Sequence, residues 1–109
     1  MNYLGHGGGG GWAQERVLRT QHIVDWENFN KLPLLVTATC SFTGYDEPNY
    51  VTAGEHSMIN EKGGVIGLFT TVRAVYSSQN KQLTDAVFKN IFEKNKIFLI
   101  KTKLFTLNQ

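Results

Sequence analysis

Two long runs of apolar and β-branched residues, at 32–40 and 64–72, dominate the hydrophobic pattern of this chain. Neither run alternates with polar residues, which is typical of strands covered on both faces of a parallel sheet. A shorter segment, residues 2–4, is interpreted as the end of a further strand. The glycine run 7–11 follows it and is expected to form a loop, because glycine loses the most backbone entropy on folding.

The first helical signal lies between the first two predicted strands. Thr20 is the expected N-cap of a helix that starts with residues 21–26 and ends at Asn30 and Lys31, with apolar side chains three residues apart. Residues 12–19, which precede this helix, fit neither a helix nor a strand pattern and remain unassigned.

Two more helices are predicted further along the chain. Thr52 and Glu55 have the spacing of a capping box, and Gly63 is the expected C′ residue of the helix they open. Residues 41–50, before this helix, are rich in turn formers. The last helix, over 82–94, carries an apolar stripe of Leu83, Val87, Phe88, Ile91 and Phe92. Strands that alternate with helices in this way predict an α/β fold with a parallel sheet.

Composition narrows the possible classes of protein. The chain has 109 residues and a formal net charge of +2, which is too small to indicate a nucleic-acid partner. Its single cysteine excludes an internal disulfide and a cysteine-based zinc site. No apolar run is long enough for a membrane span, and no signal-peptide pattern follows Met1. Because a strand and a glycine loop come at once after Met1, we expect the chain to be part of a larger domain whose upstream part is absent.

Two residues with catalytic chemistry follow predicted strands: His6 comes two residues after the first, and Cys40 ends the second. The carboxyl ends of parallel strands are where catalytic groups gather in an open α/β sheet. An imidazole can polarise a thiol and later protonate the leaving amine. The backbone N–H of Gly7 could face a developing oxyanion without steric obstruction. The pattern is therefore compatible with a cysteine peptidase.

A simpler interpretation uses the same residues without chemistry. A lone cysteine in an apolar strand is more commonly a small buried hydrophobe, and His6 in a glycine loop is more commonly solvated. The chain would then be a non-catalytic α/β interaction module. A phosphate-binding loop is excluded because no Gly-Lys-Ser/Thr follows the glycines, and a serine esterase site is excluded because no Gly-x-Ser-x-Gly occurs. The irregular spacing of the histidines argues against zinc, and no metal or cofactor is expected.

Several strings in order along the chain resemble the gingipain family of cysteine peptidases. They are Asn-Tyr-Leu-Gly-His-Gly at 2–7, Leu-Pro-Leu-Leu-Val-Thr-Ala-Thr-Cys at 32–40, Ala-Gly-Glu at 53–55 and Glu-Lys-Gly-Gly at 61–64. The run from 6 to 18, which includes Trp-Ala-Gln-Glu-Arg-Val-Leu, is the most specific part. It is most similar to the branch that acts as sortase and signal peptidase of the type IX secretion system in Bacteroidetes.

This resemblance implies a caspase-like parallel-sheet sandwich, represented here only in part by about three core strands and three helices. The partial peptidase domain would cover residues 1–94, and residues 95–109 would be a tail of uncertain structure in which 97–105 could form an edge strand. The resemblance implies that His6 is the general base and acid and that Cys40 is the nucleophile. It further implies an oxyanion hole from the backbone N–H groups of Gly7 and Cys40, and a substrate cleft near Thr71, Arg73 and Tyr76.

The same resemblance implies a reaction and a location. The parent protein would remove C-terminal sorting domains from secreted cargo, with transfer of the new carboxyl end to a lipopolysaccharide amine. Its partners would be that cargo and other type IX secretion components, on the extracellular side of the outer membrane. An arginine- or lysine-specific surface protease of the gingipain type is an alternative that matches residues 12–16 less well. Because family members take the acid that orients the histidine from further upstream, we expect the isolated chain to turn over little.

Overall fold

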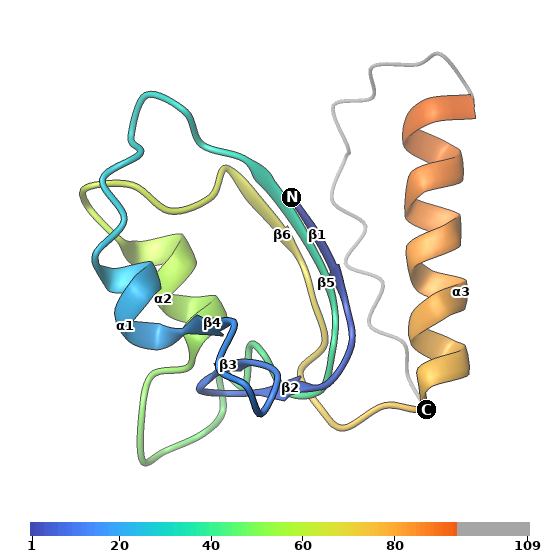
Figure 1. Ribbon diagram of the computed structural model, residues 1–109, viewed down its shortest axis with the longest axis horizontal. Helices are drawn as coiled ribbons and strands as arrows, with labels where there is room; N and C mark the ends of the chain where they lie inside the picture. Colours follow the sequence, from blue (N-terminus) through green and yellow to red (C-terminus); the bar gives the residue numbers. More distant parts are fainter. Residues whose placement is uncertain (94–109) are drawn as a thin grey trace.

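The computed structural model describes residues 1–93, and within them the main sheet is parallel. It consists of β1 (Asn2–Leu4), β5 (Leu34–Ala38) and β6 (Gly67–Phe69), in the order β1-β5-β6. The helices α1 and α2 lie on one side of this sheet and α3 lies on the other (Figure 1). The predicted α/β fold with three core strands and three helices is therefore confirmed, and it is compatible with part of a caspase-like fold.

The central strand is the most deeply buried part of the sheet. Residues 35–38 of β5 are all buried, whereas the three residues of β6 are only half-buried. Both strands are shorter than the apolar runs that predicted them. β5 begins at Leu34, two residues after the start of its predicted run, because Pro33 has no N–H to donate to a neighbouring strand. The Pro33 carbonyl oxygen accepts a hydrogen bond from the Ile66 N–H at 3.0 Å.

The glycine run does not form the loop that the sequence predicted. It contributes β2 (Gly7–Gly8) and β3 (Gly11–Trp12), which pair with β4 (Leu18–Arg19) in an antiparallel sheet of order β2-β3-β4. Gly11 has φ +135°, and a Cβ there would collide with the carbonyl group of Leu18. Glycine is used here because the strands of this small sheet approach too closely for a side chain. The unassigned segment 12–19 supplies Trp12 of β3, the whole of β4 and the loop between these two strands.

The helices begin and end differently from the predicted positions. Helix α1 (Thr20–Val24) starts at Thr20, so that the N-cap is Arg19, and it ends well before Asn30. Helix α2 (Ala53–Ile59) has its C-cap at Asn60 rather than a C′ residue at Gly63. Helix α3 (Ser77–Phe88) begins five residues earlier than expected and continues as a π-helical turn over Lys89–Glu93.

The capping box of α2 is confirmed. The Glu55 carboxylate accepts hydrogen bonds from the backbone N–H and the hydroxyl of Thr52, at 2.7 and 2.6 Å. The predicted apolar stripe of α3 is only partly buried: Leu83, Val87, Phe88 and Ile91 are half-buried, and the fully buried residues of this helix are Asn80 and Thr84. The stripe residue Phe92 is exposed and stacks on Phe88. The predicted edge strand at 97–105 lies outside the described residues.

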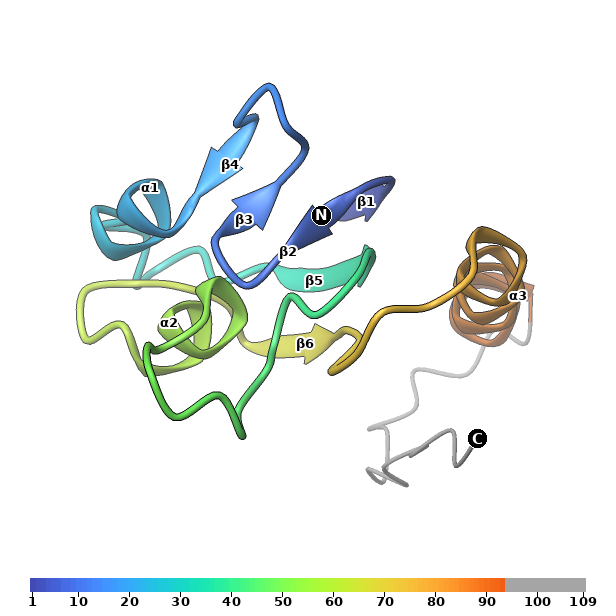
Figure 2. The same ribbon diagram turned by 90° about the horizontal axis from the view of Figure 1, so that it is seen from below.

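A single apolar cluster joins the two sheets to α1 and α2. Its buried members are Trp12, Leu18, Ile23, Leu35, Phe42, Ala53 and Val65. The rings of Tyr3 from β1 and Trp12 from β3 stack with centroids 4.3 Å apart. The small β2-β3-β4 sheet is therefore packed against the carboxyl-end half of the parallel sheet, and Figure 2 shows it continuing from β1 on the side away from β6.

Candidate active site

The register of the parallel sheet sets the positions of His6 and Cys40. Leu4 of β1 lies opposite Ala38 of β5, and the Gly5 N–H donates to the Ala38 carbonyl at 3.2 Å. His6 and Cys40 each follow these paired residues by two positions. The two residues therefore leave the carboxyl edge of the sheet from adjacent strands, as the sequence predicted for its two catalytic candidates.

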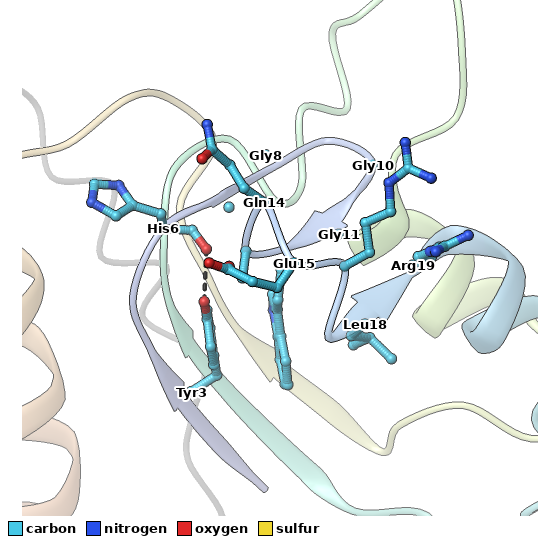
Figure 3. A pocket seen from close by; sticks show the side chains of 13 residues that line it. Tyr3, His6, Gly8, Gly10, Gly11, Gln14, Glu15, Leu18 and Arg19 are labelled. Carbon is cyan, nitrogen blue, oxygen red and sulfur yellow. Dashed lines mark hydrogen bonds between the residues drawn. The ribbon is translucent and has the colours of Figure 1, made fainter.

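His6 is held by its backbone and leaves its ring in solvent. Its carbonyl oxygen accepts hydrogen bonds from the Tyr3 hydroxyl at 2.7 Å and from the Ala13 N–H at 2.8 Å. The residue is exposed, and its imidazole points outward, away from Glu15 (Figure 3). No hydrogen bond joins this ring to the Cys40 thiol within residues 1–93. The two residues thus share an edge of the sheet without a hydrogen bond between their side chains in this conformation.

Cys40 is half-buried, in contrast to the fully buried residue that a purely structural cysteine would be. Its Sγ lies 3.7 Å from the Val75 carbonyl oxygen and donates to it. The next residue, Ser41, has φ +47°, and its N–H donates to the Arg73 carbonyl at 3.2 Å. The backbone turns sharply just after the thiol, and the segment that follows β6 holds this turn in place.

Gly7 packs directly against the strand that carries Cys40. A Cβ on Gly7 would collide with the hydroxyl of Thr39 and would lie 2.8 Å from the Gly11 carbonyl oxygen. Thr39 is fully buried and immediately precedes Cys40. The backbone of the glycine that follows His6 is therefore brought close to the residue before the thiol, which only a residue without a side chain allows.

The residues expected to line a substrate cleft lie beside Cys40 and have different environments. The buried Thr71 donates its hydroxyl hydrogen to the carbonyl oxygen of Thr39, which ties the β6 end to the strand before the thiol. Arg73 is exposed and forms an ion pair with Asp46, in the loop after Cys40. Tyr76 is exposed and caps the start of α3.

The Arg73–Asp46 pair changes the charge behaviour of both groups. Hydrogen bonding to Arg73, together with its positive charge, lowers the pKa of the Asp46 carboxyl, and the same contacts raise the pKa of Arg73. One of these hydrogen bonds, from Arg73 Nη1 to Asp46 Oδ1, measures 2.8 Å. The ion pair links the loop after the thiol to the segment after β6, and both partners are accessible to solvent.

An open depression of about 740 Å³ lies next to His6, over the β2-β3-β4 sheet (Figure 3). Its lining consists of Tyr3, His6, Gly7, Gly8, Gly10, Gly11, Trp12, Ala13, Gln14, Glu15, Arg16, Leu18 and Arg19. Tyr3 has its pKa raised by burial first and by the negative charge of Glu15 second. Sequence reasoning missed this depression because residues 12–19 matched no regular periodicity.

Backbone strain is concentrated around the candidate residues. Among residues 1–93, Ala13 (φ +58°), Arg16 (φ +59°) and Ser41 (φ +47°) are the non-glycine residues in the left-handed region. Ala13 donates to the carbonyl of His6, and Ser41 follows Cys40. Such conformations are costly for L-residues and are concentrated at functional sites. The strain thus points to the same edge of the sheet as the two chemically capable side chains.

The described part of the chain shows neither a metal centre nor a membrane-spanning helix. Between residues 1 and 93, no group of three or more His, Cys, Asp and Glu side chains is arranged to hold a metal ion. The helices of this part are too short and too polar to cross a membrane.

Comparison with known proteins identifies the family of this chain. The family model described as "Peptidase family C25", the gingipain family, matches residues 1–105. No curated protein and no solved structure matches the chain. The matched range covers both candidate residues and the whole of the depression beside His6.

Proposed function

Because this chain belongs to peptidase family C25, a family of cysteine peptidases, we propose that Cys40 is its nucleophile and His6 its general base and acid. The observation that carries this proposal is the register of β1 and β5, which brings both residues to one edge of the sheet. The left-handed turn at Ser41 and the half-buried thiol support it, because both keep Sγ near the surface at the end of the strand.

The proposed reaction follows from these positions. His6 takes the thiol proton, and the Cys40 thiolate attacks the carbonyl carbon of the peptide bond. The backbone N–H groups of Gly7 and Cys40 stabilise the oxyanion that forms. The carbon–nitrogen bond then breaks, and His6 returns its proton to the leaving amine. Water, or an acceptor amine where the acyl group is transferred, then attacks the thioester carbonyl and releases the Cys40 thiol. Thr71, Arg73 and Tyr76 belong to the part of the cleft that holds the acyl side of the substrate, with Thr71 acting through the backbone it binds.

The two side chains must move to meet. Cys40 donates to the Val75 carbonyl, and the imidazole of His6 points into solvent. Rotation of the exposed imidazole and of the thiol about their χ angles is needed for a productive pair, and rotamer changes of this kind are fast in exposed side chains.

On the resemblance of residues 6–18, we propose that the parent protein acts in type IX secretion. It would cleave C-terminal sorting domains from secreted cargo at the outer surface of the outer membrane, and pass the new carboxyl end to a lipopolysaccharide amine. The isolated chain is expected to have little turnover. Cleavage of a cargo protein that depends on Cys40 in the parent protein, and is absent in its Cys40→Ser variant, tests this assignment.

The test of the proposed dyad is the pH dependence of Cys40 alkylation by iodoacetamide. We expect rapid alkylation that continues below pH 7, and a loss of roughly tenfold or more in rate at that pH on His6→Ala, since imidazolium stabilises the thiolate. His56→Ala is the matched control, because this histidine lies on α2, on one side of the sheet, and does not follow a strand at its carboxyl edge. A slow thiol whose rate ignores His6 would instead support the non-catalytic interaction module.

A further inference from the structure

The order of the strands assigns a direction to any peptide that crosses the proposed site. Along the carboxyl edge, the segment after β6, then Cys40, then His6 follow one another, and the β2-β3-β4 sheet continues beyond His6 (Figure 2). The histidine must deliver its proton to the amine nitrogen of the leaving segment. The leaving segment therefore lies on the His6 side, where the open depression of about 740 Å³ begins.

Charged side chains from the described part of the chain line this depression, and they form no ion pairs with one another. Glu15, Arg16 and Arg19 all line it, and none of them forms an ion pair with another residue between 1 and 93. Figure 3 shows Glu15 near the Tyr3 hydroxyl, at the His6 end, and Arg19 at the opposite end. The charge along the depression thus runs from negative beside the dyad to positive further away, with a net positive balance.

The backbone of this loop is built at a cost in conformational energy. Ala13 and Arg16 both adopt left-handed φ values, and the Ala13 N–H donates a hydrogen bond to the His6 carbonyl oxygen. The buried Trp12 lines the floor of the depression and stacks on Tyr3. A strained loop on an aromatic floor holds the backbone at Arg16 in a fixed relation to the histidine, which a simple solvated loop would not require, and the exposed side chains of Arg16 and Arg19 extend from this framework.

We propose that this depression is the subsite for the leaving segment and that Arg16 and Arg19 select acidic side chains in that segment. Guanidinium groups recognise carboxylates through paired hydrogen bonds. Glu15 repels a carboxylate placed next to the scissile bond and attracts the new ammonium group that forms there. The acidic side chain therefore belongs at the second or third residue after the cleaved bond. This inference rests on the proposed function for its direction, but the charge selection can be measured without turnover.

The experiment measures binding of leaving-segment peptides to the full chain carrying Cys40→Ser. The probes are Gly-Glu-Glu-Gly amide, Gly-Gln-Gln-Gly amide and Gly-Lys-Lys-Gly amide, each with a free amino terminus. Binding is followed by NMR at the indole N–H of Trp12 and at the amides of Gly8 and Gly10, which line the depression. We expect the acidic peptide to bind about tenfold more tightly than the others, an advantage that shrinks as salt is added.

Variants separate the arginines from the general charge of the protein. Arg16→Glu/Arg19→Glu is expected to reverse the preference toward the lysine peptide, and Arg16→Gln/Arg19→Gln is expected to abolish it. Lys31→Glu changes the net charge by the same amount as the glutamine double variant, at one exposed site outside the depression, and this control is expected to keep the preference. If the charge reversal prevents folding, Arg16→Gln/Arg19→Gln still tests the proposal.

Three results would overturn the subsite: equal binding of the three peptides, a preference that survives in both double variants, or an equal loss in the Lys31 control. None of them depends on whether Cys40 is reactive. If alkylation shows a His6-dependent thiol while the peptides show no charge preference, the proposed dyad stands and the subsite falls. If the preference is present and the thiol is inert, the depression is a binding site for acidic peptides and its role in catalysis is refuted.

Discussion

At the scale of single residues, Gly7 sets the distance between the two strand ends that form the site. Its Cα faces the Thr39 hydroxyl and the Gly11 carbonyl oxygen so closely that a Cβ has no space. His6 precedes it and Thr39 precedes Cys40, so the glycine controls how closely the two candidate strand ends approach. The sequence identified Gly7 as an oxyanion-hole candidate, but the packing reason lies in Thr39, which is remote in sequence and could not be inferred from the glycine run itself.

Gly7→Ala is expected to destabilise the fold by roughly 1–3 kcal/mol, because the added methyl group overpacks the contact with β5. It should also slow alkylation of Cys40 at neutral pH, since β2 must move away from the thiol strand. Gly8→Ala is a close control, because a Cβ at Gly8 meets nothing within 4 Å. Urea unfolding and alkylation rates measure both effects. Equal stabilities of the two variants would show that the Gly7 contact is not tight in solution.

At the scale of elements, α2 is the segment whose start the sequence predicted best. The Thr52 hydroxyl and backbone N–H hold the Glu55 carboxylate, and these bonds lower its pKa, with a smaller contribution from the positive charge of His56. A carboxyl group with a lowered pKa in the folded state adds stability above its unfolded pKa and loses it as the pH falls. The helix start should therefore weaken in acid.

Replacement of Glu55 tests this linkage. Glu55→Gln should cost about 0.5–1 kcal/mol at neutral pH, in the range of other capping changes, and the cost should disappear as the pH falls below about 4. The difference in free energy of unfolding between the two proteins, measured across pH 3–7, gives the result. Glu61→Gln, at an exposed position after α2, is the control. A cost for Glu55→Gln that is constant across this range would contradict the assigned role of the carboxylate.

The fold and the site were predictable to different degrees, for physical reasons that particular elements make clear. β5 is buried on both faces, so its continuous apolar run was sufficient to identify it, and the capping box marked α2. The glycine run was misinterpreted because its strands are stabilised by close backbone approach and not by side chains. The apolar stripe of α3 is only half-buried, and its two fully buried residues, Asn80 and Thr84, are polar, so apolar periodicity does not reveal them. His6 and Cys40 were found because each follows a strand, whereas the left-handed loop between β3 and β4 has no sequence signature.

At the scale of the whole molecule, Trp12 connects the parts that the site requires. It belongs to the small antiparallel sheet, stacks on Tyr3 of the parallel sheet, and has Phe42 at 6.0 Å between ring centroids. The hairpin that carries Trp12 also supplies the Ala13 N–H to the His6 carbonyl. The position of the histidine therefore depends on packing between two sheets and not on β1 alone.

Trp12→Ala is expected to lower the free energy of unfolding by roughly 3–5 kcal/mol, a large part of the stability of a chain of this size. Phe29→Ala, which removes an exposed aromatic ring, should change it by less than about 0.5 kcal/mol. Urea unfolding followed by circular dichroism compares the two.

The milder Trp12→Phe keeps a ring against Tyr3 and is expected to stay folded, yet it leaves space beside the hairpin. If the hairpin positions His6, this variant loses the His6-dependent part of Cys40 alkylation while its helices remain intact. An unchanged alkylation profile in folded Trp12→Phe, together with a cost below about 1 kcal/mol for Trp12→Ala, would mean that the parallel sheet alone sets the geometry of the site.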